Sequence, residues 1–130
     1  MCRGGRAGVL IADGCPMVRA GLEEVLHAIE GAELAGEAGS AEETLRLAEE
    51  LRPEYVVLDH DFGVEESGVS ICRALKALPE TPVVVIYTRR GSPAEVALAR
   101  LAGADAFIHK GADLRKLQQI KRAMCRGEPV

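Results

Sequence analysis

Short apolar segments alternate along the chain with longer segments in which apolar residues recur every three or four positions. Three of the short segments, 8–12, 55–58 and 83–87, are apolar without interruption. Such runs are typical of strands that are covered on both faces of a sheet. Two weaker segments, 33–35 and 106–108, complete a set of five predicted strands.

The longer segments have the spacing of amphipathic helices, and capping signals stand at several of their ends. The apolar positions that define five predicted helices are Val18, Leu22, Val25, Leu26 and Ile29; Thr44, Leu45, Leu47, Ala48 and Leu51; Ile71, Leu75 and Leu78; Val96, Ala97 and Leu101; and Leu114, Leu117, Ile120 and Met124. Ser40 precedes the second helix and is followed three residues later by Glu43, as in a capping box. Ser92 suits the position before the fourth helix, and Pro93 suits its first residue. Three glycines stand where helices should end: Gly31, Gly103 and Gly127.

Five strands and five helices in strict alternation predict an α/β fold with a mostly parallel sheet and right-handed crossover connections. The length of 130 residues suits one domain. We expect residues 1–7, which are rich in glycine and arginine, to form a disordered arm. Residues 8–126 would form the folded domain, and residues 127–130 a tail or the start of a linker.

The composition excludes several classes of protein. The net charge of −4 and the four aromatic residues argue against direct binding of nucleic acid by this segment. The four cysteines, at positions 2, 15, 72 and 125, lack the spacing of a zinc site and favour reduced thiols in a cytoplasmic protein. The apolar run at 9–12 is too short for a signal peptide or a membrane span.

Polar residues follow the predicted strands at one edge of the sheet. Asp13 follows the first strand, and Asp59 and Asp61 follow the third. Thr88 follows the fourth strand and Lys110 the fifth. Each residue alone has an ordinary explanation as a turn, strand or surface residue. Ligand sites of open parallel sheets lie beyond the carboxyl ends of the strands, so the joint occurrence of carboxylates, a hydroxyl and an amine there indicates a functional site.

These segments resemble the receiver domain of bacterial two-component response regulators, over about residues 8–127. The segments that carry the resemblance are VLIAD at 9–13, PMVRAGL at 16–22, VVLD at 56–59, PVVVIYT at 82–88 and GADAFIHK at 103–110. Residues 122–130 further resemble the last helix and linker start of the subfamily with a C-terminal LuxR-type helix-turn-helix. The resemblance implies a flavodoxin-like, doubly wound sheet of five parallel strands in the order 2-1-3-4-5 with five helices.

The resemblance implies that the acidic residues serve a phosphorelay. Asp59 would accept a phosphoryl group from the phosphohistidine of a histidine kinase. Asp13, Asp59 and Asp61 would hold a Mg²⁺ ion, which neutralises charge during phosphoryl transfer. Members of the family usually carry two adjacent acids after the first strand, and here the second position is Gly14. The affinity for Mg²⁺ is therefore expected to be weakened.

The remaining site residues would respond to the phosphoryl group. Thr88 would donate its hydroxyl to this group, and Lys110 would pair with its oxygens as a point charge. Phe107 stands at the position of the family's switch aromatic, which packs inward when the loop after the fourth strand moves. Together they imply a two-state element that a local charge biases. The protein would be a signalling module rather than an enzyme, with no catalytic residue of its own.

The resemblance also implies partners. A histidine kinase would supply the phosphoryl group, and an effector domain or partner protein would dock on the fourth helix, fifth strand and fifth helix. The same face would serve in a homodimer. The fourth helix is apolar on nearly all sides, and Leu98 points away from Val96 and Leu101 at helical spacing, so we expect an exposed Leu98 at an interface.

Departures from the family pattern leave two other interpretations open. Gly14, and Arg89 where the family prefers a small residue, fit a phosphorylation-independent receiver that serves as an interaction or dimerisation module. The D-x-D motif formed by Asp59 and Asp61 resembles that of haloacid-dehalogenase-like phosphatases, with the first acid as nucleophile and the second as acid/base. Against the phosphatase, 58 residues precede the motif, and the paired acids expected after Lys110 are missing.

Overall fold

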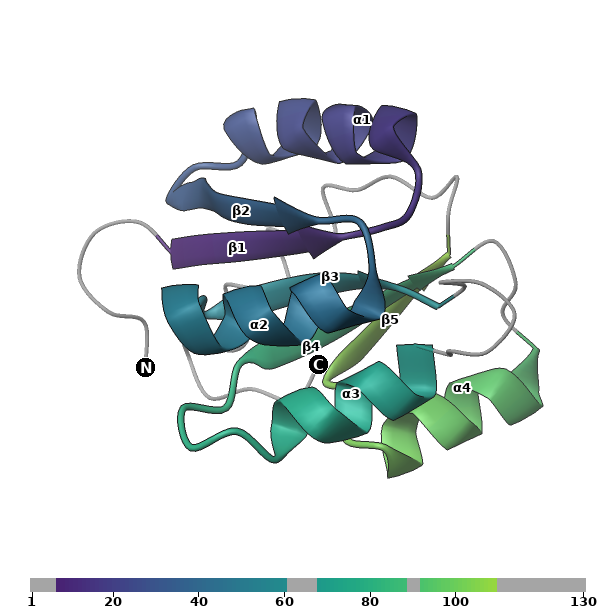
Figure 1. Ribbon diagram of the computed structural model, residues 1–130. Coiled ribbons are helices and arrows are strands. Elements are labelled where there is room, and N and C mark those ends of the chain that lie inside the picture. The colour runs from purple at the N-terminus through teal and green to yellow at the C-terminus, as the bar shows by residue number, and fades with distance from the viewer. Residues whose placement is uncertain (1–6, 61–67, 89–91, 110–130) are drawn as a thin grey trace.

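Five parallel strands form one sheet in the order β2-β1-β3-β4-β5 (Figure 1), which confirms the predicted topology. The computed structural model describes residues 7–60, 68–88 and 92–109. The strands are β1 (Ala7–Ala12), β2 (Ala32–Ala38), β3 (Tyr55–Asp59), β4 (Val83–Thr88) and β5 (Ala106–His109). All five predicted strands are therefore present, and β3 lies in the middle of the sheet.

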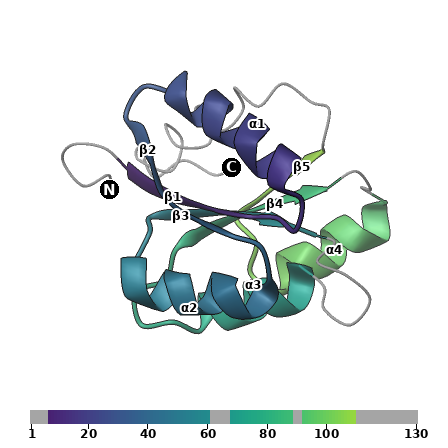
Figure 2. The same cartoon turned by 45° about the horizontal axis from the view of Figure 1, so that its top comes forward.

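Helices cover both faces of the sheet. The four helices of the described residues are α1 (Pro16–His27), α2 (Ala41–Leu51), α3 (Gly68–Lys76) and α4 (Pro93–Leu101). Figure 2 shows α1 on one face and α2, α3 and α4 on the other. The predicted fifth helix, with its apolar positions from Leu114 to Met124, and the predicted helix end at Gly127 lie outside the described residues.

The central strands bury side chains toward both layers of helices. Val56 and Leu58 of β3 join the apolar cluster under α2, α3 and α4. Tyr55 and Val57 alternate with them and join the cluster under α1. Successive side chains of a strand point to opposite faces. The uninterrupted apolar run at 55–58 therefore reflects two apolar cores, one on each side of the sheet.

The predicted capping residues stand at the helix ends. The Ser40 Oγ accepts a hydrogen bond from the Glu43 N–H at 3.2 Å, and the Ser92 Oγ accepts one from the Glu95 N–H at 3.2 Å. Gly31 and Gly103 have φ of 82° and 101°, in the left-handed region that favours glycine at helix ends. The two serine caps fix the starts of α2 and α4, and the two glycines allow the chain to turn after α1 and α4.

The packing of α4 differs from the predicted pattern. The spacing predicts that Val96, Ala97 and Leu101 face the core, but Ala97 is exposed and Leu101 is 82% exposed. The buried residues are instead Ala99 and, just after the helix, Ala102. An apolar pattern on nearly all sides does not define which face is buried, and here the helix packs through its small residues. Leu98 is 54% exposed, which confirms the expected exposure of this side chain.

Candidate functional site

The carboxyl ends of the strands bring Asp13, Asp59 and Thr88 to one edge of the sheet. Ala12 of β1 pairs with Leu58 of β3, so Asp13 and Asp59 follow at neighbouring strand ends. Asp59 in turn pairs with Tyr87 of β4, and Thr88 is the next residue of that strand. Lys110, which directly follows β5, and Asp61 both lie outside the described residues.

Asp13 sits on a turn that its neighbours hold in place. The residue is only 2% exposed, and its Oδ1 accepts a hydrogen bond from the Cys15 N–H at 2.8 Å. Its carbonyl oxygen accepts a hydrogen bond from the Arg19 Nη1 at 2.6 Å, and its N–H donates to the Ala38 carbonyl at 3.0 Å. The same arginine lies 3.5 Å through Nε from the Glu37 carboxylate. The turn after β1 is thereby tied to both α1 and the end of β2.

Asp59 ends the central strand and is 4% exposed. Beyond it, the His60 N–H donates to the Tyr87 carbonyl at 3.1 Å, and the His60 carbonyl accepts from the Gly68 N–H at 2.8 Å. A Cβ on Gly68 would lie 2.9 Å from the Asp59 carbonyl oxygen and 2.8 Å from the His60 Cα. Only glycine therefore allows α3 to begin so close to Asp59. Nothing in the sequence indicates this role, because an isolated glycine in a loop gives no sign of which backbone packs against it.

The donor set suits a hard cation held by few protein ligands. Asp13 and Asp59 are the carboxylates among the buried residues that the structure describes. Within these residues, no group of three or more acidic, histidine or cysteine side chains is placed to hold a metal. Mg²⁺ prefers oxygen ligands and is commonly held by one or two carboxylates plus waters. Two neighbouring carboxylates therefore fit Mg²⁺.

Gly14 leaves open space where a second acid would stand. A Cβ at this position would meet only the Gly39 carbonyl oxygen, at 3.8 Å, which is an ordinary contact. The residue is exposed, and its φ lies outside the left-handed region. Neither sterics nor backbone geometry requires glycine here. The missing acid is therefore a change in chemistry that the fold does not impose.

Phe107, His60 and Glu95 also lie around this edge. Phe107 of β5 pairs with Ile86 and packs, half-buried, against the core under α2, α3 and α4. His60 points toward α4, with its Nε2 3.5 Å from the Glu95 Oε2. The structure thus places the proposed switch aromatic within the sheet and adds a contact between the end of β3 and α4.

The two described cysteines differ in their surroundings. Cys15 is exposed at the N-cap of α1, beside the candidate site. Cys72 of α3 is buried, and its Sγ lies 3.8 Å from the Ala102 carbonyl oxygen. Burial raises the pKa of the Cys72 thiol to about 11, so this residue is a protonated apolar side chain at neutral pH.

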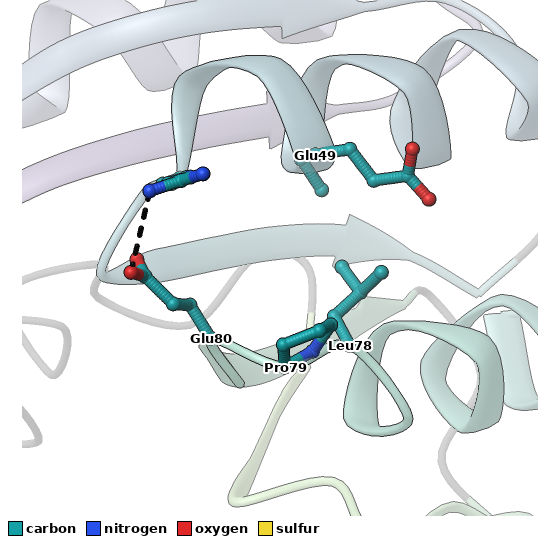
Figure 3. Close-up of a pocket in the computed structure, with 6 residues that line it drawn as sticks. Glu49, Leu78, Pro79 and Glu80 are labelled. Atoms are coloured by element: carbon teal, nitrogen blue, oxygen red, sulfur yellow. Dashed lines mark hydrogen bonds and ion pairs between the residues drawn. The ribbon is translucent and has the colours of Figure 1, made fainter.

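A groove of about 390 Å³ lies at the opposite edge of the sheet. It is lined by Ala48, Glu49, Arg52, Leu78, Pro79 and Glu80 (Figure 3). The Arg52 guanidinium and the Glu80 carboxylate lie 3.5 Å apart across it. None of the predicted site residues lines this groove.

In the described part of the chain, no helix has the length and hydrophobicity to cross a bilayer.

Comparisons with known proteins match most of this chain. The family described as the response regulator receiver domain matches residues 9–122. The response regulator GacA of Pseudomonas aeruginosa is 33% identical over 124 residues, which cover 92% of this chain and 56% of that protein. The chain thus spans about half the length of the curated relatives it matches.

Solved structures show the same fold. The receiver domain of the putative response regulator NarL from Mycobacterium tuberculosis superposes with a TM-score of 0.85 at 21% identity, covering 95% of this chain and 99% of that one. A LuxR-family two-component response regulator from Aurantimonas sp. SI85-9A1 gives a TM-score of 0.86 at 26% identity, covering 96% of this chain and 89% of the other.

Proposed function

Because the chain belongs to the response regulator receiver domain family, we propose that it is the phosphoryl acceptor of a two-component phosphorelay and that Asp59 receives the phosphoryl group. One observation supports this assignment most directly. Asp59 is a buried carboxylate at the carboxyl end of the central strand, and Asp13 follows the neighbouring strand β1. This edge is where open α/β sheets carry their ligands.

The proposed reaction uses the Asp59 carboxylate as nucleophile. A carboxylate oxygen attacks the phosphorus of a kinase phosphohistidine, the new O–P bond forms, and the N–P bond breaks with its electron pair returning to the imidazole. Asp13 and Asp59, with Asp61 nearby in sequence, would hold Mg²⁺. When bound, Mg²⁺ supplies the positive charge that lets a carboxylate approach a phosphoryl group. Thr88 would donate its hydroxyl to the phosphoryl oxygens, and Lys110 would pair with them.

The proposed output is a change at the face of α4 and β5. Receiver domains of response regulators interact with histidine kinases and with effector domains. On this chain, Leu98 and Leu101 of α4 are large apolar side chains in contact with solvent. Phe107 on β5 is half-buried and would carry the change of state to this face. We propose that an effector domain, or a second copy of the chain, docks here, in a cytoplasmic protein.

A phosphorylation-independent receiver is the alternative that Gly14 keeps open, because the metal site lacks the carboxylate that the family usually has at this position. The phosphatase interpretation has no support in the family match, which extends over residues 9–122. The two receiver hypotheses differ in one measurable property, which is whether Asp59 becomes phosphorylated.

The test is a direct measurement of phosphorylation. The protein is incubated with acetyl phosphate over a range of Mg²⁺ concentrations, and its intact mass is followed. We expect an acid-stable, base-labile gain of one phosphoryl group that requires Mg²⁺ at unusually high concentration and is lost in Asp59→Asn. Asp105→Asn, at the opposite edge of the sheet, is the matched control and should be phosphorylated. A folded wild type without any gain at any Mg²⁺ concentration would establish the phosphorylation-independent alternative.

A further inference from the structure

His60 is fixed at the point where β3 ends and the proposed acceptor stands. Its N–H donates to the Tyr87 carbonyl at 3.1 Å, and its carbonyl accepts from the Gly68 N–H at 2.8 Å. These two bonds tie its backbone to β4 and to the start of α3. The His60 side chain therefore starts from a held backbone position one residue after Asp59.

The His60 side chain reaches across to α4. Its Nε2 lies 3.5 Å from the Oε2 of Glu95, and the imidazole is 14% exposed. Glu95 stands in the first turn of α4, where its own N–H donates to the Ser92 Oγ at 3.2 Å. A side chain next to the proposed acceptor thus contacts the helix that follows β4.

This contact leaves hydrogen-bonding capacity unused. The His60 Nδ1 and the Glu95 Oε2 are buried and have no hydrogen-bond partner. A buried polar atom without a partner costs free energy, and most such atoms in native structures are satisfied. A contact of this kind is easily exchanged for a better one, since neither side chain gives up a good hydrogen bond when it moves.

We infer that the contact between His60 and Glu95 is a latch that holds α4 in the arrangement of the unphosphorylated protein. The inference rests on the proposed function of Asp59. Phosphorylation replaces the single negative charge of the Asp59 carboxylate with an acyl phosphate that carries nearly two, beside His60. Its oxygens offer the imidazole a hydrogen bond that Glu95 does not make, and their charge repels the Glu95 carboxylate. The latch opens, and α4, which carries Leu98 and Leu101 on its surface, is released to its second arrangement.

The latch has a consequence for ligand affinity. A contact that stabilises only the unphosphorylated arrangement opposes the binding of any phosphoryl mimic, and its removal strengthens that binding by the same factor. His60→Leu and Glu95→Gln should therefore each bind beryllofluoride, a noncovalent phosphoryl mimic, about threefold more tightly than the wild type. The double variant should gain no more than either single variant, because both changes break one contact.

The experiment measures the dissociation constant of beryllofluoride at saturating Mg²⁺ by calorimetry, and the hydrogen exchange of α4 amides without the mimic. The controls are His27→Leu, at the exposed end of α1, and Glu42→Gln, which also removes an acid from the first turn of a helix. Both should behave as the wild type, whereas the latch variants should exchange α4 amides faster. Affinities equal to or weaker than that of the wild type, or additive effects in the double variant, would overturn the latch.

The two proposals fail in different ways. A wild type that binds Mg²⁺ but no beryllofluoride would contradict the proposed function of Asp59. The hydrogen exchange of α4 would then test whether the contact between His60 and Glu95 holds α4 in place, and unchanged exchange in His60→Leu would show that it does not. Normal binding of beryllofluoride with identical affinity in all variants would leave the acceptor function standing and reject the latch alone.

Discussion

The two edges of the sheet differ in how fully their buried polar atoms are hydrogen-bonded. At the amino edge, the Lys76 ammonium lies 2.7 Å from the Asp105 Oδ2 and donates to the Pro82 carbonyl at 3.1 Å. The same Asp105 oxygen accepts a hydrogen bond from the Val84 N–H at 2.9 Å. Lys76 and Asp105 therefore have short, direct partners, and together they join α3, β4 and the start of β5.

At the carboxyl edge, the carboxylates of Asp13 and Asp59 follow neighbouring strands, and both residues are buried. Beside them, polar atoms of His60 and Glu95 are buried without a hydrogen-bond partner. A buried polar atom without a partner opposes folding, whereas a satisfied polar network supports it. The comparison indicates that the amino edge serves stability and that the carboxyl edge is arranged for binding at a cost in stability.

The largest loss of stability among these predictions for the two edges is expected at the amino edge. Asp105→Ala removes the partner of the Lys76 ammonium and the acceptor of the Val84 N–H, so we expect a loss of about 2 kcal/mol in the free energy of unfolding. Urea denaturation measures this loss. Asp105→Asn keeps an oxygen acceptor and should lose less. An alanine variant within about 0.5 kcal/mol of the wild type would show that this network contributes little.

The next effect concerns the metal affinity of the carboxyl edge. Gly14→Asp adds a carboxylate where the structure has room for one, so we expect Mg²⁺ to bind about tenfold more tightly. Isothermal titration calorimetry measures the dissociation constant. Gly21→Asp is a matched control, because it adds the same charge to α1 at a position with no heavy atom within 4 Å of the new Cβ. An equal gain in both variants would mean that general charge, not ligation, raises the affinity.

Removal of an acidic group should change the free energy of unfolding in opposite directions at the two edges. Asp59→Asn removes one of two neighbouring buried carboxylates, so without Mg²⁺ we expect it to raise the free energy of unfolding by about 1 kcal/mol. Urea denaturation without metal gives the value. Saturating Mg²⁺ should reduce the difference in free energy of unfolding between Asp59→Asn and the wild type, because ligand binding stabilises the folded wild type. A less stable Asp59→Asn would contradict the view that this edge is arranged at the expense of stability.

The fold was largely predictable where both faces of a strand are covered. β3 and β4 appear in the sequence as uninterrupted apolar runs, because two cores use alternate side chains. β2 was predicted only at 33–35 but extends over Ala32–Ala38. It is an edge strand with a single neighbour, and its pairing to β1 shifts register between Leu34 and Gly36. Partial burial tolerates polar residues, so its pattern is weak.

The site was predictable in its positions but not in its contacts. Strand ends and residue types were sufficient to select Asp13 and Asp59, because parallel strands end at one edge. The contact between His60 and Glu95 joins residues 35 positions apart through side chains, and neither residue has a distinctive sequence neighbourhood. Gly68 was missed for a similar reason, since its requirement for glycine comes from the backbone of β3. Such contacts depend on how elements pack, which periodicity does not encode.

The smallest effect on stability is expected on the surface that the carboxyl edge would control. Leu98 is exposed on α4 while its neighbour Ala99 is fully buried. Leu98→Glu should therefore change the free energy of unfolding by less than about 0.5 kcal/mol, whereas Ala99→Glu, the matched control, should unfold the domain. Sedimentation of the beryllofluoride complex should show a dimer for the wild type and a monomer for Leu98→Glu. Loss of secondary structure in Leu98→Glu would place this side chain in the core, and an intact dimer would assign self-association to another face.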